Sequence, residues 1–212
     1  MVDENSAEHY KIQENGFNWR ACLIAPAGAI LAILLLTVMA SVFSLRSKVQ
    51  NGNPQTPRIV LERREAFADF GREFFAIAHK ADQVNERAFA ELGKLSKHTG
   101  DLARVQDAFS DASLANKNAS SRYKALVVPR VLVSREQLRQ AADLMSSAYT
   151  ARSQACDIVV LWTSSPRSKD IAQKYNSQIG KINALTMKSL RILVLAAKDN
   201  GIAIDDLRQL LP

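Results

Sequence analysis

Residues 21–45 read ACLIAPAGAILAILLLTVMASVFSL, a run of 25 residues that contains no charged side chain. Arg20 precedes the run and Arg46 follows it. An α-helix rises 1.5 Å per residue, so about 20 apolar residues cross the hydrocarbon core of a bilayer. A helix also pairs its own backbone N–H and C=O groups, for which the lipid core offers no hydrogen-bond partner. The run therefore predicts a single membrane-spanning helix that separates a short tail from a large domain.

Two alternatives compete with this membrane anchor. Residues 38–40 (VMA) fit the small-residue cleavage site of a secretory signal peptide, but the apolar core of such a peptide usually has about 7–15 residues and this run is longer. A buried core helix of a soluble protein is the other alternative. Phe17 and Trp19 lie just before the run, at the interface level that aromatic rings favour, which supports an uncleaved anchor.

The sequence divides into five segments around this anchor. They are a polar tail (1–20), the transmembrane helix (21–45), a linker (46–57), a helical domain (58–200) and a C-terminal tail with a short helix (201–212). The linker contains Asn-Gly, Asn-Pro and Thr-Pro, which are typical of turns and loops. Only 8 glycines and 6 prolines occur in 212 residues, so the domain has the composition of a helical protein.

Apolar residues at steps of three and four predict four long helices in the domain, over about 57–97, 101–128, 134–164 and 166–199. Breakers separate them: Gly100, Pro129, Pro166 and Gly201. Ser134 and Gln137 have the spacing of a capping box at the start of the third helix. Long helices joined by short loops pack as antiparallel neighbours. We therefore predict an all-α fold, in which an N-terminal transmembrane helix precedes an antiparallel up-down four-helix bundle.

Some polar residues fall near the predicted core. Asn116 interrupts the apolar stripe of the second helix, where we expect it to fix the register of packing and to bind no ligand. His79, Asp82 and Glu86 occupy adjacent turns of the first helix, and we expect them on a solvated face. Cys156 lies near the stripe of the third helix, as a small buried residue would.

The predicted topology gathers positive charge at one end of the bundle. The start of the first helix, the connection between the second and third, and the end of the fourth all lie next to the anchor. We call these segments, residues 44–65, 120–140 and 186–212, the basic pole. They hold 14 basic and 6 acidic residues, a net charge of +8, whereas the rest of 44–212 holds 12 basic and 11 acidic residues, a net charge of +1.

We expect the basic pole to rest on anionic lipid headgroups, which attract Lys and Arg close to the surface. An ordinary solvated basic surface is the alternative. The residues predicted at the membrane interface are Trp19, Arg20, Arg46, Lys48, Arg58, Arg63, Arg122, Lys124, Arg130, Arg135 and Arg139. The sequence argues against nucleic acid as a partner, because it contains no zinc knuckle, helix-turn-helix or aromatic-and-basic motif.

Motifs of known enzyme chemistry do not occur in the sequence. None of the three histidines belongs to an HExxH or Glu-x-x-His motif, and neither GxSxG nor GxGxxG is present. We therefore predict a protein without catalytic activity, cofactor or metal. The leading hypothesis is a membrane-anchored interaction or scaffold protein that binds a partner protein or self-associates by coiled-coil contacts of its anchor or first helix.

Two other functions stay open at this point. In general form the domain resembles the antiparallel bundles of bacterial sensory receptors, which implies a bundle that binds a small ligand, although no second transmembrane helix follows the fourth helix. A membrane-acting effector is the third possibility, with only the segment 205–211 as a candidate for insertion.

The side of the membrane on which the domain lies is open as well. Lys11 and Arg20 flank one side of the anchor, whereas the other side carries four basic residues within 20 positions: Arg46, Lys48, Arg58 and Arg63. The positive-inside rule therefore favours a cytoplasmic domain. N-terminal anchors with large following domains often export them, which favours the opposite side.

Overall fold

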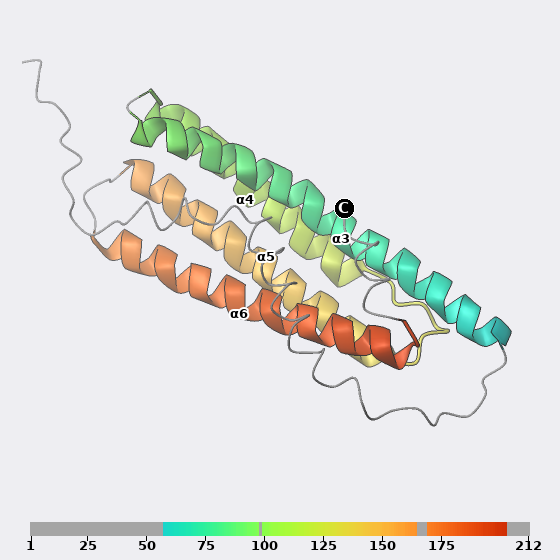
Figure 1. Ribbon diagram of the computed structural model, residues 1–212. Helices are drawn as coiled ribbons and strands as arrows, with labels where there is room; N and C mark the ends of the chain where they lie inside the picture. Colours follow the sequence, from blue (N-terminus) through green and yellow to red (C-terminus); the bar gives the residue numbers. More distant parts are fainter. Residues whose placement is uncertain (1–56, 98, 165–168, 203–212) are drawn as a thin grey trace, which may run out of the picture.

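The computed structural model describes residues 57–97, 99–164 and 169–202. These form four helices and no strand: α3 (Pro57–Ser96), α4 (Leu102–Ala125), α5 (Arg135–Ser164) and α6 (Lys169–Asp199), shown in Figure 1. No helix in these ranges combines the length and apolar character that a bilayer crossing requires. The predicted transmembrane helix, the N-terminal tail, most of the linker and residues 203–212 of the C-terminal tail lie outside the described residues, as do Trp19, Arg20, Arg46 and Lys48.

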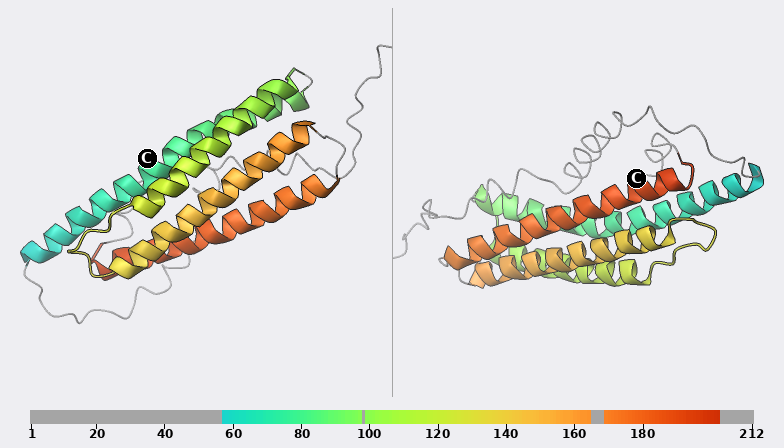
Figure 2. Two further views of the ribbon diagram at one scale, coloured as in Figure 1. Left: turned by 180° about the vertical axis from the view of Figure 1, so that it is seen from behind. Right: turned by 90° about the horizontal axis from the view of Figure 1, so that it is seen from below.

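The helices pack in chain order, α3 on α4, α4 on α5 and α5 on α6, and each runs opposite to its neighbour (Figure 2). The register follows from pairs of contacts. Along the α4–α5 interface, Ser113 bonds Ser153 and Ser120 bonds Ser146, so residue numbers rise on one helix as they fall on the other. Between α5 and α6, Ser189 donates to the carbonyl of Ala141 and Ser134 to that of Ala196. The all-α four-helix bundle is confirmed.

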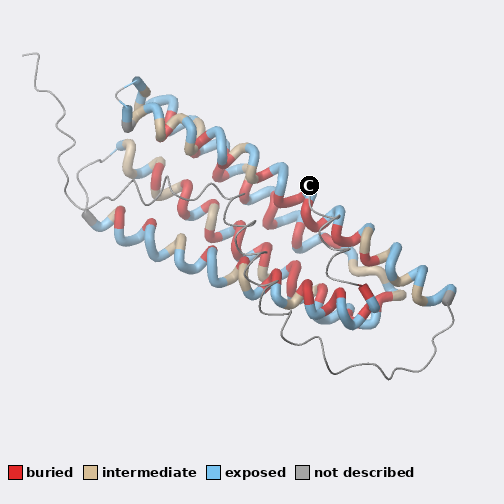
Figure 3. Tube along the Cα trace, in the orientation of Figure 1, coloured by how far each residue is buried: buried red, intermediate tan, exposed pale blue. Residues whose placement is uncertain are grey.

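Two hydrophobic clusters fill the bundle, and Figure 3 shows the buried positions on the inner sides of the helices. The first lies towards the start of α3, where the Phe74 and Tyr123 rings meet edge-on with centroids 5.0 Å apart. The second surrounds Val105, Phe109 and Ile182. The stripe predicted for 101–128 is buried at every position except Leu102, which is half-buried. The 3.6-residue period therefore identified the correct inner face.

Small side chains dominate the α4–α5 interface. Ser113 and Ser120 lie seven residues apart on α4, as do Ser146 and Ser153 on α5, and all four are buried. The Ser113 hydroxyl bonds that of Ser153, and the Ser120 hydroxyl bonds that of Ser146, each at 2.9 Å. Seven alanines of α4 and α5 are also buried in the bundle: Ala112, Ala119, Ala141, Ala142, Ala148, Ala151 and Ala155. Small residues allow the two backbones to approach closely, and the paired hydroxyls satisfy one another in the interior.

One helix end differs from the sequence prediction, and one predicted capping residue has a further partner. The second helix ends at Ala125, three residues before the predicted end, because Leu126 turns to an extended conformation (φ −61°, ψ 123°) and places its side chain in the core. The predicted start of the third helix is correct, because α5 begins at Arg135 and the Ser134 carbonyl accepts the amide of Leu138. The Ser134 hydroxyl, in addition, donates to the carbonyl of Ala196 on α6. The end of α6 is as predicted: Gly201 has φ 74°, and the amide of Ile202 reaches back to the carbonyl of Ala197 at 3.0 Å.

Candidate functional site

The structure brings the described parts of the basic pole to one end of the bundle. The start of α3, the loop 126–134 between α4 and α5, and the end of α6 lie together there, and α3 continues past the other helices (Figures 1 and 2). The opposite end holds the α3–α4 turn. Antiparallel packing therefore concentrates three charged segments that are far apart in the sequence.

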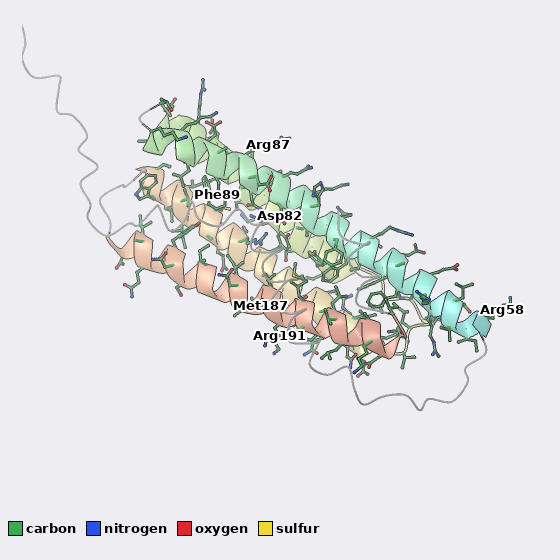
Figure 4. All side chains as sticks on the ribbon, in the orientation of Figure 1. Arg58, Asp82, Arg87, Phe89, Met187 and Arg191 are labelled. Carbon is green, nitrogen blue, oxygen red and sulfur yellow. The ribbon has the colours of Figure 1, made fainter. Side chains whose placement is uncertain are left out.

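Most of the predicted interface residues within the described ranges are exposed. Arg58 lies at the free end of α3 (Figure 4), and Arg63 is half-buried one turn further on. Four others are exposed at the end of α4, in the loop and at the start of α5: Arg122, Lys124, Arg130 and Arg135. The segments that carry these side chains thus lie at the same end of the bundle.

Arg139 has a different position from the rest. It is half-buried, and its guanidinium donates to the carbonyl oxygens of Tyr123 and Leu126, each at 2.8 Å. It also pairs with Asp143 at 2.9 Å. The last carbonyls of a helix have no partner within the helix, so this arginine caps α4. Arg139 therefore stabilises the structure of the pole, and its guanidinium is engaged in contacts within the protein.

Asn200 ties the pole together. Its amide oxygen accepts the backbone N–H of Val133 at 3.0 Å, and its amide nitrogen donates to the Ser134 hydroxyl at 2.6 Å and to the Ala196 carbonyl at 2.7 Å. This group of contacts, which we call the Asn200 clasp, joins the end of α6 to the loop before α5. This role of Asn200 could not be predicted from the sequence, because its partners in the loop, Val133 and Ser134, are more than 60 residues away in the chain.

Apolar side chains accompany the charges at the pole. Val127 and Val133, in the loop, are 77% and 60% exposed. Ile59 and Leu61 are exposed at the start of α3, and Leu195 in the last turn of α6. The other large exposed hydrophobic residues in the described ranges are Leu114 and Leu161, away from the pole on α4 and α5. The pole therefore combines positive charge with exposed apolar surface.

A second set of functional groups lies inside the bundle. Arg152 Nη1 is 2.5 Å from Asp82 Oδ1, and the Tyr149 hydroxyl donates to the same oxygen at 3.2 Å. The guanidinium also lies over the Tyr149 ring, 4.8 Å from its centroid. Both ionic side chains are less than one-fifth exposed. Asp82 points inwards from α3 (Figure 4), so the expectation of a solvated face was wrong for this residue, whereas His79 and Glu86 are exposed.

The electrostatics of this cluster favour the charged pair. Burial disfavours the charge on Arg152, but Tyr149 and Asp82 outweigh it, and the pKa of Arg152 is raised. Burial raises the pKa of Tyr149 above its ordinary value. The tyrosine therefore remains a neutral hydrogen-bond donor beside the ion pair of Asp82 and Arg152.

One turn further along, two asparagines bond each other. Asn85 and Asn116 exchange two hydrogen bonds, of 3.0 and 2.9 Å, and Asn116 also lies 3.5 Å from the Cys156 sulfur. Burial raises the pKa of the Cys156 thiol to about 12, so the thiol stays protonated and is a poor nucleophile at neutral pH. We call these six residues, Asp82, Asn85, Asn116, Tyr149, Arg152 and Cys156, the polar layer. It links α3, α4 and α5.

The polar layer lies apart from the hollows on the surface. Two shallow hollows run along the outer side of α4 and α5, lined in part by Ser113, Lys117 and Asp157, and Lys117 pairs with Asp157 there at 3.7 Å. In the described ranges, no three His, Cys, Asp or Glu side chains are grouped as metal ligands. Comparison of the chain with protein-family models, with curated proteins and with solved structures found no match.

Proposed function

We propose that this chain is a membrane-anchored interaction protein without catalytic activity, whose helical bundle is held against an anionic bilayer by the basic pole. The observation that carries the proposal is the gathering of exposed basic and apolar side chains at the end of the bundle that follows the 21–45 run. The long sides of the bundle are then available to a partner protein or a second copy.

Chain length supports this arrangement. Eleven residues, 46–56, separate the apolar run from Pro57, and a fully extended chain spans at most about 3.6 Å per residue. The start of α3 therefore lies within about 40 Å of the end of the anchor. A linker of this length allows the basic pole to reach the bilayer surface. Each basic residue that comes within a Debye length of an anionic surface, about 8–10 Å, contributes roughly 1 kcal/mol to the attraction.

The polar layer also supports an interaction role. Asp82 and Arg152 form an ion pair, and Asn85 and Asn116 exchange hydrogen bonds, so these buried groups satisfy one another within the bundle. Internal pairs of this kind define how helices align, as a single buried asparagine does in coiled coils. Binding would accordingly use the outside of a bundle with a fixed shape.

The proposal can be tested by co-sedimentation of residues 44–212 with vesicles. The test variant reverses three exposed charges at the basic pole, Arg122→Glu, Lys124→Glu and Arg130→Glu. The matched control reverses three exposed charges elsewhere, Arg87→Glu, Lys97→Glu and Arg104→Glu, which changes the net charge equally. We expect the test variant to lose affinity for anionic vesicles by about a hundredfold or more, since three attractive contributions vanish.

The control variant should bind more tightly than the test variant, and wild-type binding should weaken as salt is added. Equal binding of wild type to anionic and zwitterionic vesicles would contradict the lipid contact. Equal losses in the two variants would show that net charge alone matters and that the pole has no special role.

A further inference from the structure

We infer that the loop 126–134 is a membrane-inserting element, in which Val127 and Val133 enter the boundary between headgroups and acyl chains of an anionic bilayer while Arg130 stays at the level of the phosphates. This inference rests on the proposed function and adds to it the segment that touches lipid. It commits to a lipid surface as the ligand.

Side chains along the loop alternate between buried and exposed positions. Leu126, Leu132 and Ser134 are buried, and Val128 and Val131 are half-buried against the first hydrophobic cluster. Between them, the side chains that face outwards are Val127, Arg130 and Val133. The loop therefore presents two valines and an arginine to the outside while its other side is packed on the core.

Hydrogen bonds to neighbouring helices hold the loop in this conformation. Arg139 binds the carbonyl of Leu126 at one end, and Asn200 accepts the amide of Val133 and donates to Ser134 at the other. The amide of Leu132 also reaches the carbonyl of Pro129 at 3.3 Å. The exposure of the two valines is thus built into the fold, since both ends of the loop are bonded to neighbouring helices.

The basic residues around the two exposed valines indicate lipid as the ligand. Single exposed hydrophobic residues are common on soluble proteins, but here they gather at the end of the bundle where basic residues also gather. Arg130 lies between the valines in the sequence, and Lys124 and Arg135 flank the loop, all exposed. Apolar side chains among Lys and Arg are what interfacial segments use to bind anionic membranes. The linker also keeps this end of the bundle near the predicted anchor.

The experiment uses the full chain in vesicles and tryptophan as a depth probe. In a background with Trp19→Phe and Trp162→Phe, one variant carries Val127→Trp and another Val133→Trp. The matched control is Leu114→Trp, which replaces a residue that is also exposed (59%) but lies on α4 away from the pole. Vesicles contain anionic lipid with bromine atoms at different depths of the acyl chains, which quench tryptophan on contact.

We expect quenching at positions 127 and 133 to exceed that at position 114 several-fold. It should be strongest with shallow bromines, because interfacial segments bury only about 5–10 Å into the boundary. It should also fall in purely zwitterionic vesicles. Quenching at 127 and 133 no greater than at 114 would overturn the inference. A blue-shifted but unquenched tryptophan would do so as well, because protein or a second copy would then cover the loop.

A flotation assay on the same samples separates this inference from the proposed function. If the chain floats with vesicles and the loop is not quenched, insertion is wrong while the membrane anchorage stands. If the chain does not float, the proposed function fails and the inference fails with it. Circular dichroism of all three variants should match that of the tryptophan-free background, because each variant replaces one further, exposed side chain.

Discussion

Arg152 occupies the position between Ala148 and Ala155 on α5 where the apolar period calls for a core residue. Ala148 and Ala155 are seven residues apart, two helical turns, so the charged residue between them was the sequence signal for a buried charge. Its partner was harder to find, because Asp82 lies on another helix, 70 residues away, beside the predicted stripe of α3. The polarity of Asn116 was visible in the sequence, whereas its pairing with Asn85 depends on how α3 and α4 align.

We predict that Asp82→Asn lowers the free energy of unfolding by about 3 kcal/mol, because it leaves the buried guanidinium of Arg152 without a counter-charge. The double variant Asp82→Leu with Arg152→Met should recover most of the loss, since apolar residues of similar volume often replace a buried ion pair at little cost. Urea unfolding of the detergent-solubilised chain, followed by circular dichroism, measures both. A double variant as unstable as the single one would contradict this account.

Individual helices were the part of the fold most accessible from sequence. The 3.6-residue period located all four and selected their inner faces, because the hydrophobic effect acts on every turn. The end of α4 and the partner of the Ser134 hydroxyl could not be predicted from the sequence. The conformation of Leu126 and the hydrogen bond of Ser134 depend on contacts with other helices. The serines of the α4–α5 interface were also missed, since a hydroxyl is polar in any hydropathy pattern until close packing pairs it.

Two glycines of the α6 segment provide a matched test of helix geometry. Gly201 has φ 74°, where a Cβ is strained, so Gly201→Ala should destabilise the bundle by about 1 kcal/mol. Gly180 lies within α6, and a Cβ there meets nothing within 4 Å, so Gly180→Ala should stabilise it by about 0.5–1 kcal/mol. Thermal unfolding should therefore shift in opposite directions, and a shift of the same sign in both would contradict the assigned conformations.

At the scale of the whole molecule, topology allowed the basic pole to be predicted. Once four antiparallel helices were expected, the charge of three distant segments had to meet at one end. The exposure of Val127 and Val133 could not be predicted in this way, because a run of valines in a sequence is equally consistent with a core. The bonded ends of the loop and the packing of its other side on the core determine which of them face outwards.

The bundle as a whole should lose stability in alkali. Burial raises the pKa of Cys156 from 9.0 to about 12 and also raises the pKa values of Tyr149 and Tyr123 above 10.0. Above pH about 9 the unfolded chain releases the thiol proton and the folded chain keeps it, so unfolding becomes more favourable as pH rises. These groups contribute no change in stability below that pH. Each should lower stability by about 1.4 kcal/mol per pH unit above its own unfolded pKa, which is about 9 for the thiol and about 10 for the tyrosines.

Urea unfolding between pH 7 and 11 tests this expectation. Cys156→Ala should move the onset of the decline from about 9 to about 10, where the tyrosines of the unfolded chain begin to ionise. A stability that stays level up to pH 11 would show that these groups titrate alike in both states.

The projection of α3 beyond the other helices has a mechanical consequence. The described chain begins at Pro57, at the tip of that projection, and α3 then packs lengthwise on α4. A pull on Pro57 along the helix axis loads this interface in shear, so the contacts of successive turns resist together. A pull across the axis would peel them apart one turn at a time. The same helix pair is therefore stiff or weak according to the direction from which tension arrives.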